Sequence, residues 1–161
     1  MDKILKNHIN KNTQILKNSC KDFRSIYEIS FSAGNMILAE TDDGFRIKKY
    51  TYREVFERVE KTAAALYKKL GSTEAIIGLE MENCVEWIVA FWAILRSGNR
   101  PYLINCRHPK ELSNGIVKTL EIAHIVALNK GDLSAEYILF SELEDVDVPA
   151  VPEGIFGDEI A

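Results

Sequence analysis

Cysteine and histidine side chains gather in one short stretch, where they could hold a metal ion or form a Cys–His nucleophile. Cys106-Arg107-His108 is followed at some distance by His124. Two further metal ligands are missing, and the spacing fits no zinc knuckle. Nothing marks Cys84 or Cys106 as an activated thiolate, and a small packed hydrophobe explains Cys84 better. We therefore predict no metal site and no catalytic cysteine.

Three carboxylates lie close in sequence and could act as a general acid and base. Glu80 and Glu82 alternate along the end of a predicted strand, however, and Glu86 belongs to a helix cap. This pattern favours structural acids that are exposed to solvent over a catalytic pair.

The sequence has no motif that would cradle a phosphate or present a serine nucleophile. The nine glycines are scattered, and GxGxxG, GxxxxGK followed by Ser or Thr, and GxSxG are all absent. The aromatic pairs Trp87/Phe91 and Trp92/Leu95 could line a pocket, but their spacing is more typical of a core. From the residues alone we predict no catalytic, cofactor-binding or metal-binding residue.

The composition is that of one folded domain, with 161 residues of which 47% are hydrophobic and 27% charged. The net charge of -4 and the lack of a basic face argue against a nucleic-acid partner. The region 131–161 carries nine acids and no Lys or Arg, and we expect a solvated, loosely held terminus there.

Three cysteines without a CxxC pair indicate reduced thiols and a cytoplasmic location. The longest apolar run, from Trp87 to Leu95, is about half the length that a bilayer-spanning helix needs. We therefore predict no transmembrane segment.

The elements that must position any site begin with a helical segment over 1–30 and a hairpin. Helical spacing of apolar residues marks 3–20, and Asp-Gly separates two extended runs over 36–40 and 45–50. Thr51 and Glu54 have the spacing of a capping box for a helix that ends at Gly71. The stripe of the first helix comprises Ile4, Leu5, Ile9, Ile15, Leu16 and Cys20.

Strands and helices then alternate, which predicts an α/β fold with a largely parallel sheet and flanking helices. We expect strands at 76–81, 101–104, 125–128 and 137–140. Asn83 with Glu86 caps the second helix, whose apolar circumference predicts burial between layers. Pro109 opens the third helix, and its buried face is predicted to hold Leu112, Ile116, Leu120 and Ala123. This subdomain spans 1–145, and 146–161 is a linker that enters a further strand.

An ordered series of segments over 36–128 resembles the opening of the adenylate-forming (AMP-binding) enzymes. This family includes acyl-CoA synthetases, luciferases and peptide-synthetase adenylation domains. The segments are Tyr50–Val55, Ala63–Gly71, Ile76–Asn83, Phe91–Gly98 (similar to the family's AILKAG), Arg100–Asn105 (similar to YVPLN) and the helix and strand over 109–128.

The resemblance implies that an intact enzyme joins ATP and a small carboxylic acid into an acyl-adenylate and then often passes the acyl group to CoA. ATP, magnesium and CoA are its implied cofactors and substrates. An acyl-CoA synthetase type, with a role in fatty acid metabolism, is the expected subclass.

Two departures limit what carries over to this chain. Cys106-Arg107-His108 stands before Pro109, where the family commonly has proline directly after the asparagine. The family's Thr/Ser/Gly-rich phosphate loop should begin just after Ala161 and is not in the sequence. We therefore expect the N-terminal fragment of a larger multi-layer α/β domain, inactive by itself, whose partner is the remainder of its own enzyme.

Two other interpretations remain open. A stand-alone, non-catalytic interaction domain would bind a protein partner through the N-terminal stripe, so deleting 1–20 would abolish partner capture. A small Rossmann-like nucleotide binder would bind ATP or NAD without the glycine loop. Self-association through an open sheet edge is expected for either a fragment or an interaction domain.

Overall fold

The structure, a computed structural model, describes residues 7, 9–11, 13–15, 17, 22–42, 44–144, 146–147 and 149–157. The chain separates into two compact units, Met1–Glu57 and Arg58–Ala161, which are described in turn. The boundary falls inside the subdomain predicted over 1–145, whose extent stays a prediction.

The first unit opens with helical residues. Every described residue between 7 and 17 is α-helical, and the Thr13 hydroxyl donates to the Ile9 carbonyl (2.8 Å). Ile9 and Ile15 are 44% and 36% exposed. Helix α2 follows over Phe23–Phe31, with Asp22 as N-cap accepting from the Ser25 N–H (2.7 Å). The other stripe residues, Ile4, Leu5, Leu16 and Cys20, lie outside the described residues.

The predicted hairpin is confirmed. Strands β1 (Ile37–Asp42) and β2 (Ile47–Thr51) pair antiparallel, with Asp42 opposite Ile47. Gly44 has φ +86°, and its N–H bonds to an Asp42 carboxylate oxygen (2.8 Å). The left-handed conformation explains why the turn uses glycine.

The predicted capping box is also confirmed, at the start of helix α3 (Tyr52–Leu70). The Thr51 N–H donates to a Glu54 carboxylate oxygen (2.7 Å), and the Glu54 N–H donates to the Thr51 hydroxyl (3.2 Å). Four rings pack between α2 and the first turn of α3, with centroids 4.9 to 6.3 Å apart: Tyr27, Phe31, Tyr52 and Phe56. Tyr27 and Phe31 are buried and form the aromatic core of the first unit, while Phe56 is 37% exposed.

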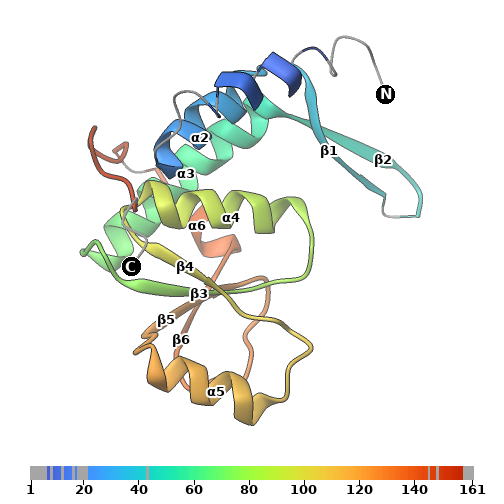
Figure 1. The fold of residues 1–161 in the computed structure, drawn as a ribbon. Helices are drawn as coiled ribbons and strands as arrows, with labels where there is room; N and C mark the ends of the chain where they lie inside the picture. The colour runs from blue at the N-terminus through green and yellow to red at the C-terminus, as the bar shows by residue number, and fades with distance from the viewer. Residues whose placement is uncertain are drawn as a thin grey trace. The chain divides into compact units, whose positions relative to one another are not determined.

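The second unit is a four-stranded parallel sheet in the order β4-β3-β5-β6. The strands are β3 (Ile76–Glu80), β4 (Arg100–Leu103), β5 (His124–Ala127) and β6 (Glu136–Leu139). The helices α4 (Val85–Arg96) and α5 (Lys110–Thr119) cover opposite faces of the sheet, and the short α6 (Ser141–Glu144) follows β6 (Figure 1). The predicted α/β class with a hairpin and flanking helices is confirmed.

Both faces of the two central strands are buried. Ile77 and Leu79 of β3 and Ile125 of β5 have no solvent exposure, and Val126 of β5 is 1% exposed. On the α5 face, Ile125 packs in a cluster with three further residues, Ile104, Val117 and Ile122. Gly78 lies on this face, where a Cβ would stand 2.8 Å from Ile104 Cδ1 and 2.9 Å from Ile125 Cγ1. The absence of a side chain at Gly78 therefore allows the isoleucines to approach the strand.

Helix α4 differs from its prediction in two ways. Its N-cap is Cys84 rather than Asn83, and the half-buried Cys84 Sγ accepts from the Trp87 N–H (3.3 Å), so Cys84 is more than a packed hydrophobe. The helix is also not buried all round, because one layer covers one stripe only. The buried residues recur at helical spacing as Val85, Val89, Ala90, Ala93, Ile94 and Leu95, whereas Trp87, Ile88, Phe91 and Trp92 are half-buried.

The third helix differs from its prediction at its first residue and in part of its buried face. Pro109 is the N-cap of α5 rather than its first residue. The buried residues of the helix are Ser113 and Val117, whereas Leu112 is 51% exposed, Ile116 is half-buried and Ala123 is exposed. Leu120 packs against the core cluster, as predicted. Docking of Val117 onto Ile122 and Ile125 sets the rotation of the helix.

The C-terminal segment is held more tightly than its acidic composition suggested. Val151 is 3% exposed and packs on Ala63, Ala64 and Ala93. No strand is present in the described part of the expected strand, 154–157. No helix among the described residues combines the length and apolar character needed to cross a membrane.

A part-buried charge cluster joins three helices of the second unit. Arg58 of α3 donates to Glu86 of α4 (3.0 Å) and to Glu144 of α6 (2.6 Å). Burial alone would raise the pKa of Glu86, but the hydrogen bond and charge of Arg58 outweigh it and hold this pKa below the usual 4.5.

We predict opposite effects of alanine at two glycines. Gly78→Ala should destabilise the second unit by about 1–3 kcal/mol, because its Cβ overpacks the isoleucine cluster. The matched control, Gly115→Ala on exposed α5 with nothing within 4 Å, should stabilise it by about 0.4–1 kcal/mol. Urea unfolding followed by tryptophan fluorescence measures both, since both tryptophans lie on α4. Equal effects at the two sites would contradict the packing explanation.

We also predict that Glu86→Gln is pH-dependent. A carboxylate with a lowered folded pKa contributes stability above about pH 4.5, and this contribution is lost as pH falls through the folded pKa. The variant should be less stable by about 1–2 kcal/mol at pH 7, and the gap should shrink at pH 3.5. Glu82→Gln, at an exposed carboxylate, is the control and should show no gap. A gap that is constant with pH would exclude the ion pair as its cause.

Candidate functional site

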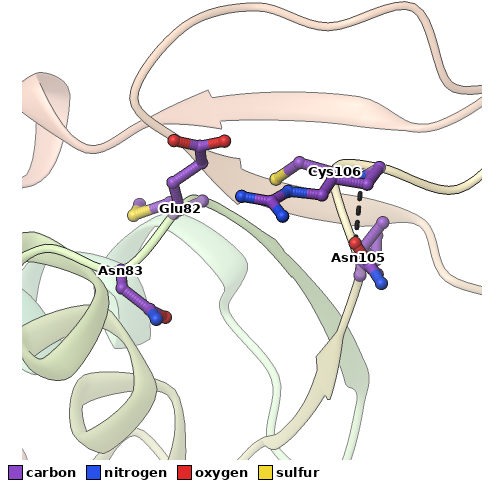
Figure 2. A pocket seen from close by; sticks show the side chains of 7 residues that line it. Glu82, Asn83, Asn105 and Cys106 are labelled. Carbon is purple, nitrogen blue, oxygen red and sulfur yellow. Dashed lines mark hydrogen bonds between the residues drawn. The ribbon is translucent and has the colours of Figure 1, made fainter.

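The candidate site is a pocket of about 490 Å³ where β3 and β4 end (Figure 2). Its lining comes from two loops: Met81, Glu82 and Asn83 after β3, and Ile104, Asn105, Cys106 and Arg107 after β4. Both loops follow the carboxyl ends of parallel strands, the edge at which open α/β sheets bind ligands.

Topology opens this pocket. The chain leaves β3 toward α4 on one face and leaves β4 toward α5 on the other (Figure 1). Adjacent loops that turn to opposite faces separate, and a crevice forms between them. The pocket is therefore a consequence of the strand order.

Local hydrogen bonds fix the β4 loop. The Asn105 side-chain oxygen accepts from the Arg107 N–H (2.9 Å), which Figure 2 shows as a dashed line, and the Asn105 carbonyl accepts from the His108 N–H (3.0 Å). Such an asparagine turn orders a loop without a helix or strand. Among the described residues, no carboxylate lies within salt-bridge distance of the Arg107 guanidinium, so an unpaired cation lines the pocket.

Cys106 is a thiol rather than a thiolate at neutral pH. Burial raises its pKa, and the negative charges of Glu80 and Glu82 raise it further. In Figure 2 the thiol turns toward the side of the pocket on which Glu82 lies. A nucleophilic cysteine requires the opposite shift.

The structure separates the residues considered as metal ligands. Cys106 and His108 follow β4 at the carboxyl edge, whereas His124 begins β5 and lies 3.4 Å from a Glu136 carboxylate oxygen. In the described part of the chain, no group of three His, Cys, Asp or Glu side chains could hold a metal ion. We therefore assign no magnesium ligand to these residues.

The three neighbouring acids occupy three different environments. Glu82 lines the pocket and Glu86 pairs with Arg58. Glu80 accepts from the Tyr137 hydroxyl (2.5 Å), and burial together with this bond raises the pKa of Tyr137 to about 12. Glu80 and Glu86 thus have structural partners rather than the solvated surroundings expected from the sequence.

The aromatic residues of α4 do not line the pocket. Trp87 and Phe91 stack with centroids 5.6 Å apart, and Phe91 meets Trp92 edge-on at 5.2 Å. The rings pack on one another along α4.

The sequence reasoning missed the polar pocket residues Asn83, Asn105 and Arg107. A usable signal was present, because each residue comes within four positions after the end of an apolar strand. Two successive strands of a parallel sheet place such residues at one edge.

Comparison with known proteins identifies a family whose sequence pattern this chain matches. The sequence model of a family described as AMP-binding enzyme matches residues 36–155. The chain is 42% identical over 67 residues to gramicidin S synthase 2 of Brevibacillus brevis, and 30% identical over 106 residues to a plipastatin synthase of Bacillus subtilis. These matches cover 42% and 62% of the chain but only 2% and 4% of the two synthases.

Solved structures share the fold at low sequence identity. The N-terminal subdomain of NpsA from Klebsiella oxytoca, in complex with 3-hydroxybenzoyl-AMSN, matches with a TM-score of 0.70 and 16% identity over 83% of the chain. o-Succinylbenzoate CoA synthetase (MenE) from Bacillus subtilis, in complex with an acyl-adenylate intermediate, matches with a TM-score of 0.67 and 13% identity over 78%. The chain spans 34% of each solved protein. Since the family model matches three-quarters of its residues in the predicted order, the chain belongs to the family of AMP-binding enzymes.

Proposed function

We propose that this chain is the N-terminal α/β portion of an adenylate-forming ligase that activates a carboxylic acid with ATP as an acyl-adenylate. The observation that carries the proposal is the family match over 36–155, which covers both the hairpin and the parallel sheet. Support comes from relatives that hold acyl-adenylates or their analogues, namely MenE with OSB-AMP and NpsA with 3-hydroxybenzoyl-AMSN.

The acyl acceptor that we propose is the thiol of CoA, as in an acyl-CoA synthetase. MenE, a CoA synthetase, supports this choice, while an NpsA fusion described as an adenylation–PCP di-domain supports a carrier-protein thiol as the competitor. No name of these relatives mentions a fatty acid. The comparisons therefore give no support to a role in fatty acid metabolism.

In this proposal the pocket after β3 and β4 binds an anionic group of a substrate. Arg107 is a charged donor without a carboxylate partner among the described residues, and Asn83 and Asn105 add amide donors beside it. Charge-assisted hydrogen bonds from a guanidinium bind and orient carboxylate or phosphate oxygens. The protonated Cys106 adds a neutral wall.

We predict that ATP–pyrophosphate exchange requires the intact enzyme. The gene should be read past the codon for Ala161, and the full product and the 161-residue chain should be purified in parallel. The intact protein should exchange label with one carboxylic acid, while the chain alone should not, because its sequence lacks a glycine-rich phosphate cradle. Acyl transfer is then measured separately with CoA and with a carrier protein. Robust ATP–pyrophosphate exchange by the 161-residue chain alone would contradict the proposal.

We predict further that Arg107→Gln weakens substrate binding in the intact enzyme. Loss of one charge-assisted contact should raise the KM of one substrate about tenfold, with a smaller effect on kcat. Arg107→Lys should recover part of the affinity, because it keeps the charge but loses the fork. Arg53→Gln, on the exposed start of α3, is the control and should change neither constant. Unchanged KM values for every substrate would show that Arg107 does not contribute to substrate binding.

A further inference from the structure

Two side chains of opposite charge line the candidate pocket without pairing with each other. Glu82 follows β3 and Arg107 follows β4, and both residues are exposed. No ion pair joins the two, and among the described residues neither has another charged partner within salt-bridge distance. The pocket therefore presents an unpaired carboxylate from one loop and an unpaired guanidinium from the other.

The Cys106 thiol lies in the electric field of both charges. Burial is the largest cause of the raised pKa of Cys106. The carboxylates of Glu80 and Glu82 raise this pKa further, whereas the Arg107 guanidinium lowers it. Glu80 already accepts a hydrogen bond from the Tyr137 hydroxyl (2.5 Å), so Glu82 is the acid of this pair that remains available to a ligand. Both unpaired charges are thus close enough to act on one neutral side chain.

Apolar side chains complete the lining. Met81 and Ile104 are each 7% exposed, so they are buried more deeply than the two charged residues. Apolar residues in a pocket favour the hydrocarbon part of a ligand, while a few charged groups fix its orientation. The volume of about 490 Å³ falls within the range of roughly 300–1,000 Å³ that is typical of small-molecule sites.

This combination discriminates between ligands by charge. A ligand with only an anionic group would bind at Arg107 but would meet like-charge repulsion from Glu82, and a dianion would meet more of it. A short hydrocarbon chain with a carboxylate at one end and an ammonium group at the other would pair with both residues. Specificity of this kind arises from the unfavourable contact as well as from the favourable one.

We propose that the pocket binds a zwitterionic carboxylic acid, whose anionic end contacts Arg107 and whose cationic end contacts Glu82. Glu82 is then a specificity-determining residue, because it favours acids that carry a cationic group and disfavours simple anions. That this ligand is the acid which the enzyme activates rests on the proposed function. Recognition by two opposite charges depends on the described residues alone.

Titration of the 161-residue chain followed by amide NMR tests the proposal without any activity. The probes are similar in length: γ-aminobutyrate is the zwitterion, butyrate the monoanion and glutarate the dianion. In the wild type, γ-aminobutyrate should shift the amides of 81–83 and 104–107 and bind about fivefold more tightly than butyrate, with glutarate the weakest. Glu82→Gln should weaken the binding of γ-aminobutyrate about fivefold and should not weaken that of butyrate, so the preference disappears.

Two further variants separate the roles of the charges. Arg107→Gln should weaken γ-aminobutyrate and butyrate by a similar factor, because both lose the contact with the guanidinium. Glu153→Gln, at an exposed carboxylate of the second unit outside the pocket, is the matched control and should change neither affinity. Equal affinity of the wild type for the two probes would overturn the proposal, as would a Glu82→Gln variant that keeps the wild-type preference. Absence of any shift in the pocket amides would also overturn it.

Kinetics of the intact enzyme then test whether this ligand is the substrate. A zwitterionic acid should support ATP–pyrophosphate exchange, and Glu82→Gln should raise the KM of that acid about fivefold while the KM of ATP stays within about twofold. Exchange with acids that lack a cationic group, and with no zwitterionic acid, would overturn the inference but leave the proposed function standing. An intact wild type without any exchange would refute the proposed function, while the recognition of two charges measured by titration would stand.

Discussion

Burial of the two central strands on both faces is the constraint on which the second unit depends. Parallel strands β3 and β5 are stable only where apolar layers exclude water from both sides of their hydrogen bonds. α4, which connects β3 to β4, supplies one layer, and α5, which connects β4 to β5, supplies the other (Figure 1). Gly78 permits the α5 layer to come close, since its missing side chain leaves room for Ile104 and Ile125. A substitution in the α5 layer therefore alters the packing of both the helix and the sheet.

The same arrangement determines where chemistry can occur. With helices on both faces and short loops between them, polar side chains collect at the edge where the strands end. There the pocket receives one loop from β3 and one from β4, and neither loop forms the site alone. Two arginines outside the pocket have structural roles. Arg58 and Arg96 each link α3 and α4 to a later part of the chain. Arg107 differs from both in having no carboxylate partner among the described residues.

Features that depend on interactions between residues close in sequence could be predicted from the sequence. The capping box of Thr51 and Glu54 and the turn at Gly44 depend on residues two or three apart, so their spacing alone indicated them. The α/β class followed from the alternation of strands and helices. The cap of α4 was misplaced by one residue, because Asn83 and Cys84 both carry acceptors and only the backbone path distinguishes them.

Features that depend on contacts between residues far apart in sequence could not be predicted. The rotation of α5 depends on the residues beneath it, which lie in other elements. Arg96 binds carbonyls 55 and 59 residues away, and a backbone carbonyl leaves no mark in the sequence. The pocket was missed for a related reason, since its two loops are about 20 residues apart and meet only after the sheet has formed.

The pairing of β4 restricts how the sheet can grow. The N–H groups of Arg100 and Ile104 point at β3, bonding to the Ala75 and Leu79 carbonyls at 2.9 and 3.0 Å. Alternation turns the nitrogen of Pro101 to the outer edge, where it has no hydrogen to donate. A strand approaching β4 from outside would therefore meet an interrupted ladder. Of the two edge strands of the four-stranded sheet, β4 carries proline and β6 does not, so the sheet can be extended with regular pairing beside β6 but not beside β4.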